Sequence, residues 1–383
     1  MRVAVVSDFG LTEITGGYKR NEEVLSRLTK FLDVVVIPSR RDLELAKDGH
    51  ERELREVLER VDAKLPAPLE EMLDPDFIPD VEADVFYVYS NSLRELELGY
   101  KLSKGRPLGV QLQLQPFYKK EEELFKITHR GPRGEERFLK AKRCSEETRP
   151  GWERMIREDK LKFATSVSRV PIDVAGLEEL GLRTIVTRPA NAFDPEAVKW
   201  RREGKEDYAV YFTRLIPEKG LFDIPEIWRK VNSERDVRLY VMGKFEDPRD
   251  AEDFEREVRD LNVEYLGFMR GSELFRVVSR ARVMLYPSHF DSFSLVTLES
   301  LAVGTPVVTF DLPAIREVYG SLRDVVKISE DDLTSMAKAV LEAMRRDYVQ
   351  SPEAIEFLKV HSSWENVARA EAQALLEISS QLR

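Results

Sequence analysis

Two acidic residues, Asp291 and Glu299, lie eight positions apart around the start of a predicted helix. An apolar run that ends at Tyr286 predicts a buried strand before them, and residues 294–303 carry apolar side chains at helical spacing. Asp291 then lies in the loop before the helix, and Glu299 lies about two turns further along. Two acids in these positions can hold two parts of one extended polar ligand.

The backbone at this predicted helix start suits an anion. The first N–H groups of a helix have no intrahelical acceptor, and the helix dipole favours negative charge there. We therefore expect the N–H groups of Phe293, Ser294 and Leu295 to point at a bound phosphate. The alternative interpretation is an ordinary surface acid and a helical Glu in a βαβ unit.

Two cations follow an earlier predicted strand. Arg214 comes just after the apolar run 208–212, and Lys219 with Gly220 leads into the next helix. A guanidinium and an ammonium at the carboxyl end of a strand, beside a helix start, suit a pyrophosphate. A pair of solvent-exposed cations without a ligand is the alternative.

Glycines occur at two other places where a backbone can approach a ligand. Gly16 and Gly17 precede a helix predicted from about residue 18 to 30, and Gly243 ends a predicted strand. A glycine pair at a helix start frees N–H donors, although a simple turn is the alternative. The loop around the pair lacks the full G-x-G-x-x-G pattern of an NAD-binding unit.

The motif positions resemble those of the retaining, nucleotide-sugar-dependent glycosyltransferases of family 4, which have the GT-B fold. The resemblance rests on Arg214, Lys219-Gly220, Asp291, Phe293-Ser294, Glu299-Ser300, Gly304 and Pro306-Val307. Two positions depart from the usual pattern of the family. Asp291 replaces a Glu and reaches one methylene less, and Ser294 replaces a Gly, which limits how closely the backbone can approach a ligand.

The resemblance implies a role for each of these positions. Arg214 and Lys219 would bind the donor diphosphate, Glu299 the ribose hydroxyls, and Asp291 the transferred sugar. Gly16 and Gly17 would line the cleft near the donor phosphates, and Gly243 would lie near the base. The resemblance further implies a nucleotide-diphosphate sugar as co-substrate, retention at the anomeric carbon, no protein nucleophile, and no required metal or other cofactor.

Strands and helices alternate through residue 330, which predicts parallel doubly wound sheets. With the resemblance, the expected fold class is α/β of the GT-B type, with two Rossmann-like domains facing a central cleft. We expect an acceptor-side domain over 1–190 plus 363–383 and a donor-binding domain over 191–362. The final helix crosses back to the first domain in the resembled fold.

The acceptor side is less well defined. A strand predicted over 107–115 places Gln111, Gln113 and Gln115 on one face. The family often has a His at the end of this strand, and here Gln113 or Gln115 takes its place as an acceptor-side candidate. A strand end that bonds to a neighbouring loop is the alternative. The charged segment 117–150 is interpreted either as a solvated insertion or as a basic flap that meets an anionic or lipid-linked acceptor.

Composition restricts the other possibilities. The 383 residues are enough for two or three domains, and a net charge of −10 argues against general nucleic-acid binding. One cysteine, Cys144, rules out an intramolecular disulfide and any zinc site built on several Cys. No apolar run approaches the ~20 residues of a membrane span. The charged fraction of 34% resembles that of thermophile proteins.

We therefore expect a cytoplasmic glycosyltransferase, since the N-terminus does not have the shape of a signal peptide. Its partners would be a nucleotide-sugar donor and a glycan, lipid-linked or small-molecule acceptor. Peripheral membrane contact is compatible with this expectation. The alternatives are a catalytically inactive sugar-nucleotide-binding protein and an epimerase or phosphorylase of the same fold.

Overall fold

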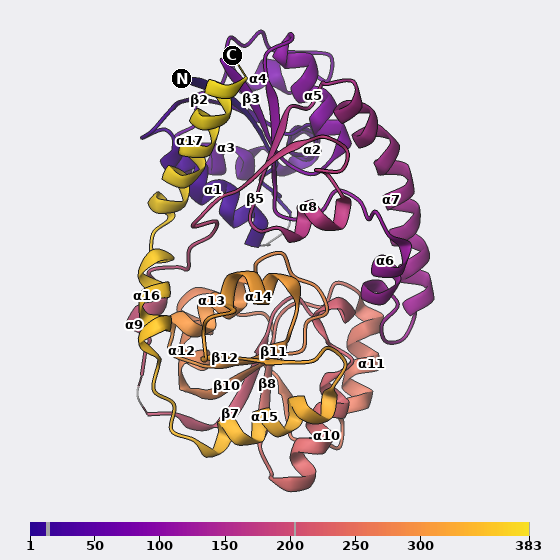
Figure 1. Cartoon of the computed structure of the whole chain (residues 1–383), viewed down its shortest axis with the longest axis vertical. Coiled ribbons are helices and arrows are strands. Elements are labelled where there is room, and N and C mark those ends of the chain that lie inside the picture. Colours follow the sequence, from indigo (N-terminus) through magenta and orange to yellow (C-terminus); the bar gives the residue numbers. More distant parts are fainter. Residues whose placement is uncertain (13–15, 203, 383) are drawn as a thin grey trace. The chain divides into compact units, whose positions relative to one another are not determined.

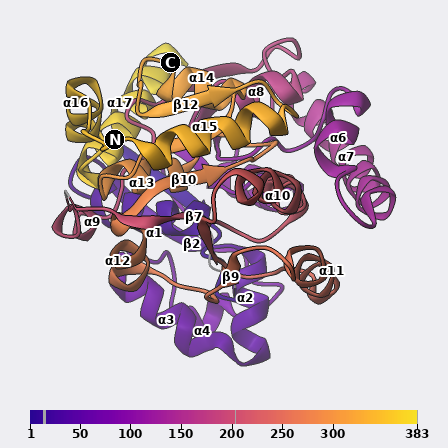
Figure 2. The ribbon, with the colours of Figure 1, turned by 90° about the horizontal axis from the view of Figure 1, so that it is seen from below.

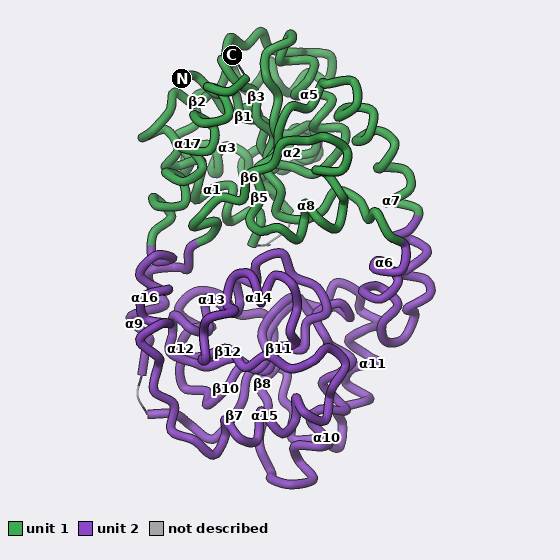
Figure 3. Tube along the Cα trace, in the orientation of Figure 1, with its two compact units in different colours: residues 1–120, 143–191, 363–383 green, residues 121–142, 192–362 purple. Residues whose placement is uncertain are grey.

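A computed structural model describes residues 1–12, 16–202 and 204–382, and the chain forms two compact units (Figures 1 and 3). Unit 1 comprises Met1–Lys120, Arg143–Asn191 and Ser363–Arg383, and unit 2 comprises Glu121–Lys142 and Ala192–Ser362. Each unit holds a six-stranded sheet in which every strand pairing is parallel. The predicted α/β class with two Rossmann-like sheets is confirmed.

The sheet of unit 1 has the strand order β2-β1-β3-β4-β5-β6. Its strands are β1 (Arg2–Ser7), β2 (Asp33–Pro38), β3 (Val85–Tyr89), β4 (Leu108–Leu112), β5 (Phe163–Ser166) and β6 (Arg183–Val186). Its helices are α1 (Gly16–Leu28), α2 (Arg40–Leu45), a π-helical turn (Ala46–His50), α3 (Glu51–Arg60), α4 (Leu69–Met72), α5 (Leu93–Ser103), α8 (Val170–Ala175) and α17 (Trp364–Gln381). The chain leaves β1 and β3 in opposite directions, so right-handed crossovers place α1 and α5 on opposite faces.

The sheet of unit 2 has the order β12-β11-β10-β7-β8-β9. Its strands are β7 (Glu206–Phe212), β8 (Arg238–Met242), β9 (Val263–Tyr265), β10 (Ala281–Tyr286), β11 (Val307–Phe310) and β12 (Val325–Ile328). Its helices are α6 (Glu121–Thr128), α9 (Glu196–Lys199), a 3-10 turn (Pro217–Lys219), α10 (Ile224–Glu234), α11 (Pro248–Val258), α12 (Gly271–Arg280), α13 (Leu295–Ala302), α14 (Pro313–Tyr319), α15 (Leu333–Arg345) and α16 (Pro352–Val360). Helices α10 and α15 pack side by side against this sheet (Figure 2).

The segment predicted as a charged insertion over 117–150 is mostly helical. Helix α6 is followed by a turn and by α7 (Gly134–Arg157), which begins in unit 2 and continues into unit 1. The compact units therefore differ from the expected domain ranges mainly at residues 121–142, which pack with unit 2. The reason is a set of contacts far apart in sequence, such as Gly131 against Phe222, and local patterns do not report these.

The terminal helix α17 packs on α1 within unit 1. A fully buried ion pair joins the two helices, because Arg20 Nη2 lies 2.5 Å from Glu371 Oε2 and both side chains are 0% exposed. Tyr89 donates a short hydrogen bond to the other oxygen of Glu371, and Arg20 Nε donates to the carbonyl of Ala190. The pair thus links α1, α17, β3 and the end of the segment 143–191.

No described helix is long and apolar enough to cross a membrane.

We predict that Glu371→Gln lowers the free energy of unfolding of unit 1 by about 3–5 kcal/mol, since it leaves the buried guanidinium of Arg20 without a counter-charge. Urea unfolding, with hydrogen exchange at the amides of α1 and α17, measures the loss. Glu365→Gln is the matched control, because Glu365 of α17 pairs at 2.6 Å with Lys30, two residues past the end of α1, and is partly exposed. Its cost should be much smaller. Equal costs for the two variants would contradict the assignment.

Candidate functional site

The order of the strands in unit 2 indicates where a ligand binds. The neighbours β7 and β10 lead to strands on opposite sides of the sheet, β8 and β11, so the strand order reverses between them. In open parallel sheets, ligands bind outside the carboxyl ends of the strands at such a reversal. Arg214 and Lys219 follow β7, and Asp291 follows β10. The fold therefore brings these three predicted residues to one edge of the sheet.

Lys219 and Asp291 form the centre of this edge. The Lys219 Nζ donates to the carbonyl oxygen of Phe290 at 2.7 Å and to Asp291 Oδ1 at 2.9 Å. Each side chain of the pair is only 10% exposed. The Tyr286 hydroxyl donates to Asp291 Oδ2 at 2.7 Å. Both oxygens of this carboxylate are thus held by donors from neighbouring elements.

Burial and neighbouring charges act on the ammonium group of Lys219. Burial lowers the pKa of Lys219 because it disfavours the ammonium form, and Arg214 lowers it further, while Asp291 opposes the shift. Each of the two cations has a carboxylate partner, since Lys219 pairs with Asp291 and Arg214 pairs with Glu246. A bound diphosphate would therefore compete with these carboxylates for the two cations.

Two loops at this edge touch through their backbones. Gly220 has φ +78°, and a Cβ added there would lie 2.0 Å from the carbonyl oxygen of Pro287. The N–H of His289 donates to the carbonyl of Glu218 at 2.9 Å. The loop that carries Lys219 is thereby joined to the loop that carries Asp291, and only glycine permits this close an approach.

Ser294 adopts the conformation that glycine prefers. Its φ of 68° and ψ of 74° lie in the left-handed region, immediately before α13. Its hydroxyl bonds to that of Thr297 at 2.8 Å, and its carbonyl accepts a hydrogen bond from Tyr319 at 2.8 Å. These contacts explain how a serine is held where the resembled family has glycine. Glu299 lies within α13 and is half-buried.

The other residues predicted at this edge are Arg214, Phe293 and Leu295. Arg214 pairs with Glu246 at 2.8 Å, and both side chains are about half exposed. The ring of Phe293 is buried against Tyr319, so only its backbone can face a ligand. Leu295 begins α13, where the N–H groups have no intrahelical acceptor.

Gly243 has a packing explanation. A Cβ at this position would lie 1.9 Å from the carbonyl oxygen of Thr213, where the ends of β7 and β8 meet. Its N–H donates to the carbonyl of Gly267 at 3.0 Å, and its carbonyl accepts a hydrogen bond from Tyr265 at 2.9 Å. Contact with a base remains a prediction for this residue.

The glutamines of unit 1 do not share a strand face as predicted. Strand β4 ends at Leu112, so Gln113 and Gln115 lie in the following loop. The Gln113 amide donates to the carbonyl of Gly17 at 3.1 Å and to Asn21 Oδ1 at 2.8 Å. This contact holds the first turn of α1, whose first two residues are Gly16 and Gly17. The alternative of a bond from the strand end to a neighbouring segment therefore describes Gln113.

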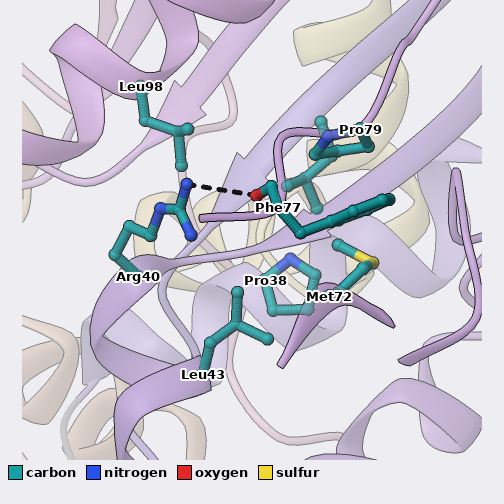
Figure 4. Close-up of a pocket in the computed structure, with 8 residues that line it drawn as sticks. Pro38, Arg40, Leu43, Met72, Phe77, Pro79 and Leu98 are labelled. Atoms are coloured by element: carbon teal, nitrogen blue, oxygen red, sulfur yellow. Dashed lines mark hydrogen bonds between the residues drawn. The ribbon is translucent and has the colours of Figure 1, made fainter. Parts of the chain in front are cut away.

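A separate cavity in unit 1 contains none of the predicted site residues (Figure 4). It is small, at about 10 Å³, and its lining is mostly apolar. Arg40 is one of its lining residues and donates to the carbonyl of Phe77 at 3.3 Å. A volume of this size holds about one water molecule, so the cavity is too small for a sugar or a nucleotide.

Sequence reasoning did not identify Tyr286 and His289 as partners in the site. Tyr286 is the last residue of β10 and holds Asp291, as described above. His289 has a side chain that is 0% exposed and contacts Asp223 and Glu330. An aromatic residue at a strand end and a histidine two residues before an acid are weak signals on their own. Their partners lie in distant segments of the chain.

Comparison with known proteins relates this edge to glycosyltransferases. Residues 206–346 match the family model described as "Glycosyl transferases group 1". The chain is 29% identical over 187 residues to a glycogen synthase of Mycobacterium tuberculosis, covering 48% of this chain and 45% of that protein. It is 26% identical over 146 residues to O-antigen chain mannosyltransferase B of Escherichia coli, covering 37% and 38% of the two chains. The chain thus spans less than half the length of these curated relatives.

Solved structures share the fold over the whole chain. Anabaena HepE in complex with UDP has a TM-score of 0.61 and 15% identity, with 100% of this chain and 98% of that chain covered. Sucrose-phosphate synthase from Thermosynechococcus elongatus has a TM-score of 0.66 and 13% identity, with both chains covered completely. At these identities the likeness establishes the two-unit Rossmann-like fold.

We predict that Gly220→Ala destabilises unit 2 more than Gly271→Ala does. Both positions have positive φ, which costs alanine about 1–2 kcal/mol. Only at Gly220 does the new Cβ also meet backbone, at Pro287, whereas it meets nothing within 4 Å at Gly271. Chemical denaturation of the two variants checks the difference, and equal losses would show that the two loops do not need this close approach.

Proposed function

We propose that this protein is a glycosyltransferase that moves a sugar from a nucleotide-diphosphate sugar to an acceptor, with retention of anomeric configuration. The observation that carries the proposal is the buried Lys219–Asp291 pair at the strand-order reversal, with Arg214 nearby. The match of residues 206–346 to a glycosyltransferase model supports it. The fold shared with HepE, whose structure contains UDP, agrees with a nucleotide-diphosphate donor.

In this mechanism the main task of the protein is electrostatic. The departing nucleoside diphosphate gains negative charge as the glycosidic bond breaks. Lys219 and Arg214 stabilise that charge, as do the N–H groups at the start of α13, because they are positioned before the reaction begins. Asp291 orients the transferred sugar, and Glu299 holds the ribose hydroxyls.

Retention follows if the acceptor attacks from the face that the diphosphate leaves. The leaving phosphate then takes the proton of the acceptor hydroxyl, so no protein nucleophile is needed. The proposal requires no metal. NMR of the initial product against the donor tests retention, because the two must share the same anomeric configuration.

The proposal names the acceptor only by its chemical class, which is a glycan, a lipid-linked sugar or a small molecule. The cytoplasm is the proposed location, since nucleotide sugars are the co-substrates.

A second candidate is a sugar-nucleotide-binding protein without transfer activity. The observation that favours it is that both oxygens of the Asp291 carboxylate already have donors within the protein, Lys219 and Tyr286. A carboxylate that is already compensated within the protein offers only its remaining lone pairs to a sugar. Donor binding without transfer or hydrolysis across a broad acceptor panel would identify this second function.

We predict that Lys219→Ala and Glu299→Ala each reduce turnover at least about 100-fold, the scale of losing one donor to the transition state. Initial rates of nucleoside diphosphate release with the productive donor and acceptor measure the effect. Lys230→Ala is the matched control, since Lys230 lies on the exposed surface of α10 and pairs with Glu226 at 3.5 Å. Unchanged turnover in both site variants would contradict the proposed mechanism.

A further inference from the structure

Residues Glu121–Lys142 form a helical hairpin, here called the α6–α7 hairpin, that packs against unit 2. Its turn lies directly on the loop that carries Lys219, because a Cβ at Gly131 would be 2.2 Å from the ring of Phe222. The sequence predicts a solvated insertion or a basic flap for this segment. Four of its basic residues, Lys126, Arg130, Arg133 and Arg137, pair with carboxylates of unit 2.

The first group of contacts joins the turn to α11. Arg133 lies 2.6 Å from Asp253 and also bonds to Asp250, and Arg137 lies 3.4 Å from Asp250. Asp250 is only 3% exposed and Asp253 is 13% exposed. The two carboxylates are thus largely covered, whereas the Arg133 and Arg137 side chains keep about a fifth of their exposure.

The second group of contacts joins the hairpin to the segment after β12. Arg130 pairs with Asp331 at 2.6 Å and lies 3.6 Å from Glu330, and Lys126 also pairs with Glu330. The Arg130 and Glu330 side chains are each 18% exposed. Glu330 is thus held from the outer side by two cations of the hairpin.

On its inner side, Glu330 bonds to a buried histidine. The Nδ1 of His289 lies 3.0 Å from Glu330 Oε1, and Nε2 lies 2.5 Å from Asp223 Oδ2. Asp223 precedes α10 in the loop that carries Lys219, and His289 lies two residues before Asp291. One imidazole therefore connects the hairpin, through Glu330, to the two loops that carry Lys219 and Asp291.

We propose that the α6–α7 hairpin, acting through Glu330 and the doubly bonded His289, positions the Lys219–Asp291 pair and thereby sets the affinity of this edge for a diphosphate. The inference rests on the proposed function for its ligand but not for its contacts. His289 is a positioning residue here, since it bonds to the loops and not to the ligand.

The charge of the imidazole decides how firmly it connects the loops. Both ring nitrogens face carboxylates, and both can donate only when the ring is protonated. Burial alone would lower the pKa of His289, but hydrogen bonds to Asp223 and Glu330 raise it above the ordinary value, with Arg130 opposing. Asp331 also lies beside the ring, with Oδ1 3.8 Å from Nδ1.

The sign of the pH effect follows from this direction. Because the pKa of His289 is raised in the folded state, its protonated ring contributes fully to stability below the ordinary pKa of 6.5. This contribution is lost as pH rises through the raised pKa. Above that value one of the two hydrogen bonds loses its donor. Positioning of the two loops should weaken over the same range.

The first test uses the free protein. At pH 6, amide hydrogen exchange should be faster in His289→Gln and in Arg130→Gln than in the wild type, within residues 217–223 and 287–294. His50→Gln is the control, because His50 is a partly exposed histidine of unit 1. Unchanged exchange in both loops of both test variants would overturn the proposal, whether or not a nucleotide binds.

The second test uses UDP, with GDP and ADP in parallel, in calorimetric titrations from pH 6 to pH 9. We expect affinity at pH 6 to be about tenfold weaker in His289→Gln than in the wild type, the scale of coupling through positioning residues. The difference should shrink as pH rises, while His50→Gln follows the wild type. Identical pH profiles for His289→Gln and the wild type would overturn the inference.

The two proposals fail in different ways. Loss of binding by every nucleoside diphosphate in the wild type, with the predicted exchange differences present, would contradict the proposed function and leave the positioning role intact. Normal nucleotide binding in the wild type, without the predicted differences in hydrogen exchange or pH profile, would contradict the positioning role and leave the proposed function intact.

Discussion

The sheet edge of unit 2 that carries Lys219 and Asp291 is organised around one buried ammonium group, which must be paired with a carboxylate and hydrogen-bonded. Taking the charge of Lys219 out of water is costly unless it is paired and hydrogen-bonded. Asp291 and the carbonyl of Phe290 supply that compensation, and Tyr286 fixes the acid. Removing one partner would leave the other charge buried and unpaired, with its full desolvation cost. The loops at the carboxyl ends of β7 and β10 are therefore arranged around a single ion pair, and a ligand with more negative charge can compete for the cation.

The same constraint recurs in unit 1 with another purpose. Arg20 and Glu371 are completely buried, and they join the first and last helices of the chain. This pair faces the hydroxyl of Tyr89 and a backbone carbonyl, and both side chains are sealed from solvent, so we assign it to architecture. At the edge of unit 2 the comparable pair lies where the strand order reverses and keeps some exposure, so we propose that it takes part in binding.

Sequence patterns predicted the parallel sheets, because strands buried on both faces are continuous apolar runs that alternate with helices. They also placed Lys219 and Asp291 in one site, and the structure brings the two side chains within 2.9 Å of each other. Their role in binding a donor stays a prediction. The sequence patterns failed where structure depends on partners far away in the chain. The α6–α7 hairpin is highly charged and was predicted as an insertion, but Asp250, Asp253 and Glu330 pair with its charges. The glutamine face was predicted from alternation alone, although β4 ends at Leu112.

The most direct test of the account is a thermal-shift comparison of nucleoside diphosphates, nucleoside monophosphates and the matching nucleotide sugars for uridine, guanosine and adenosine. A ligand that binds only the folded state at 100 times its dissociation constant stabilises it by about 2.7 kcal/mol. We predict that one base series raises the melting temperature, and that in this series the diphosphate and the nucleotide sugar act at far lower concentration than the monophosphate. No shift with any series, or equal effects of monophosphate and diphosphate, would contradict a diphosphate site built on Lys219.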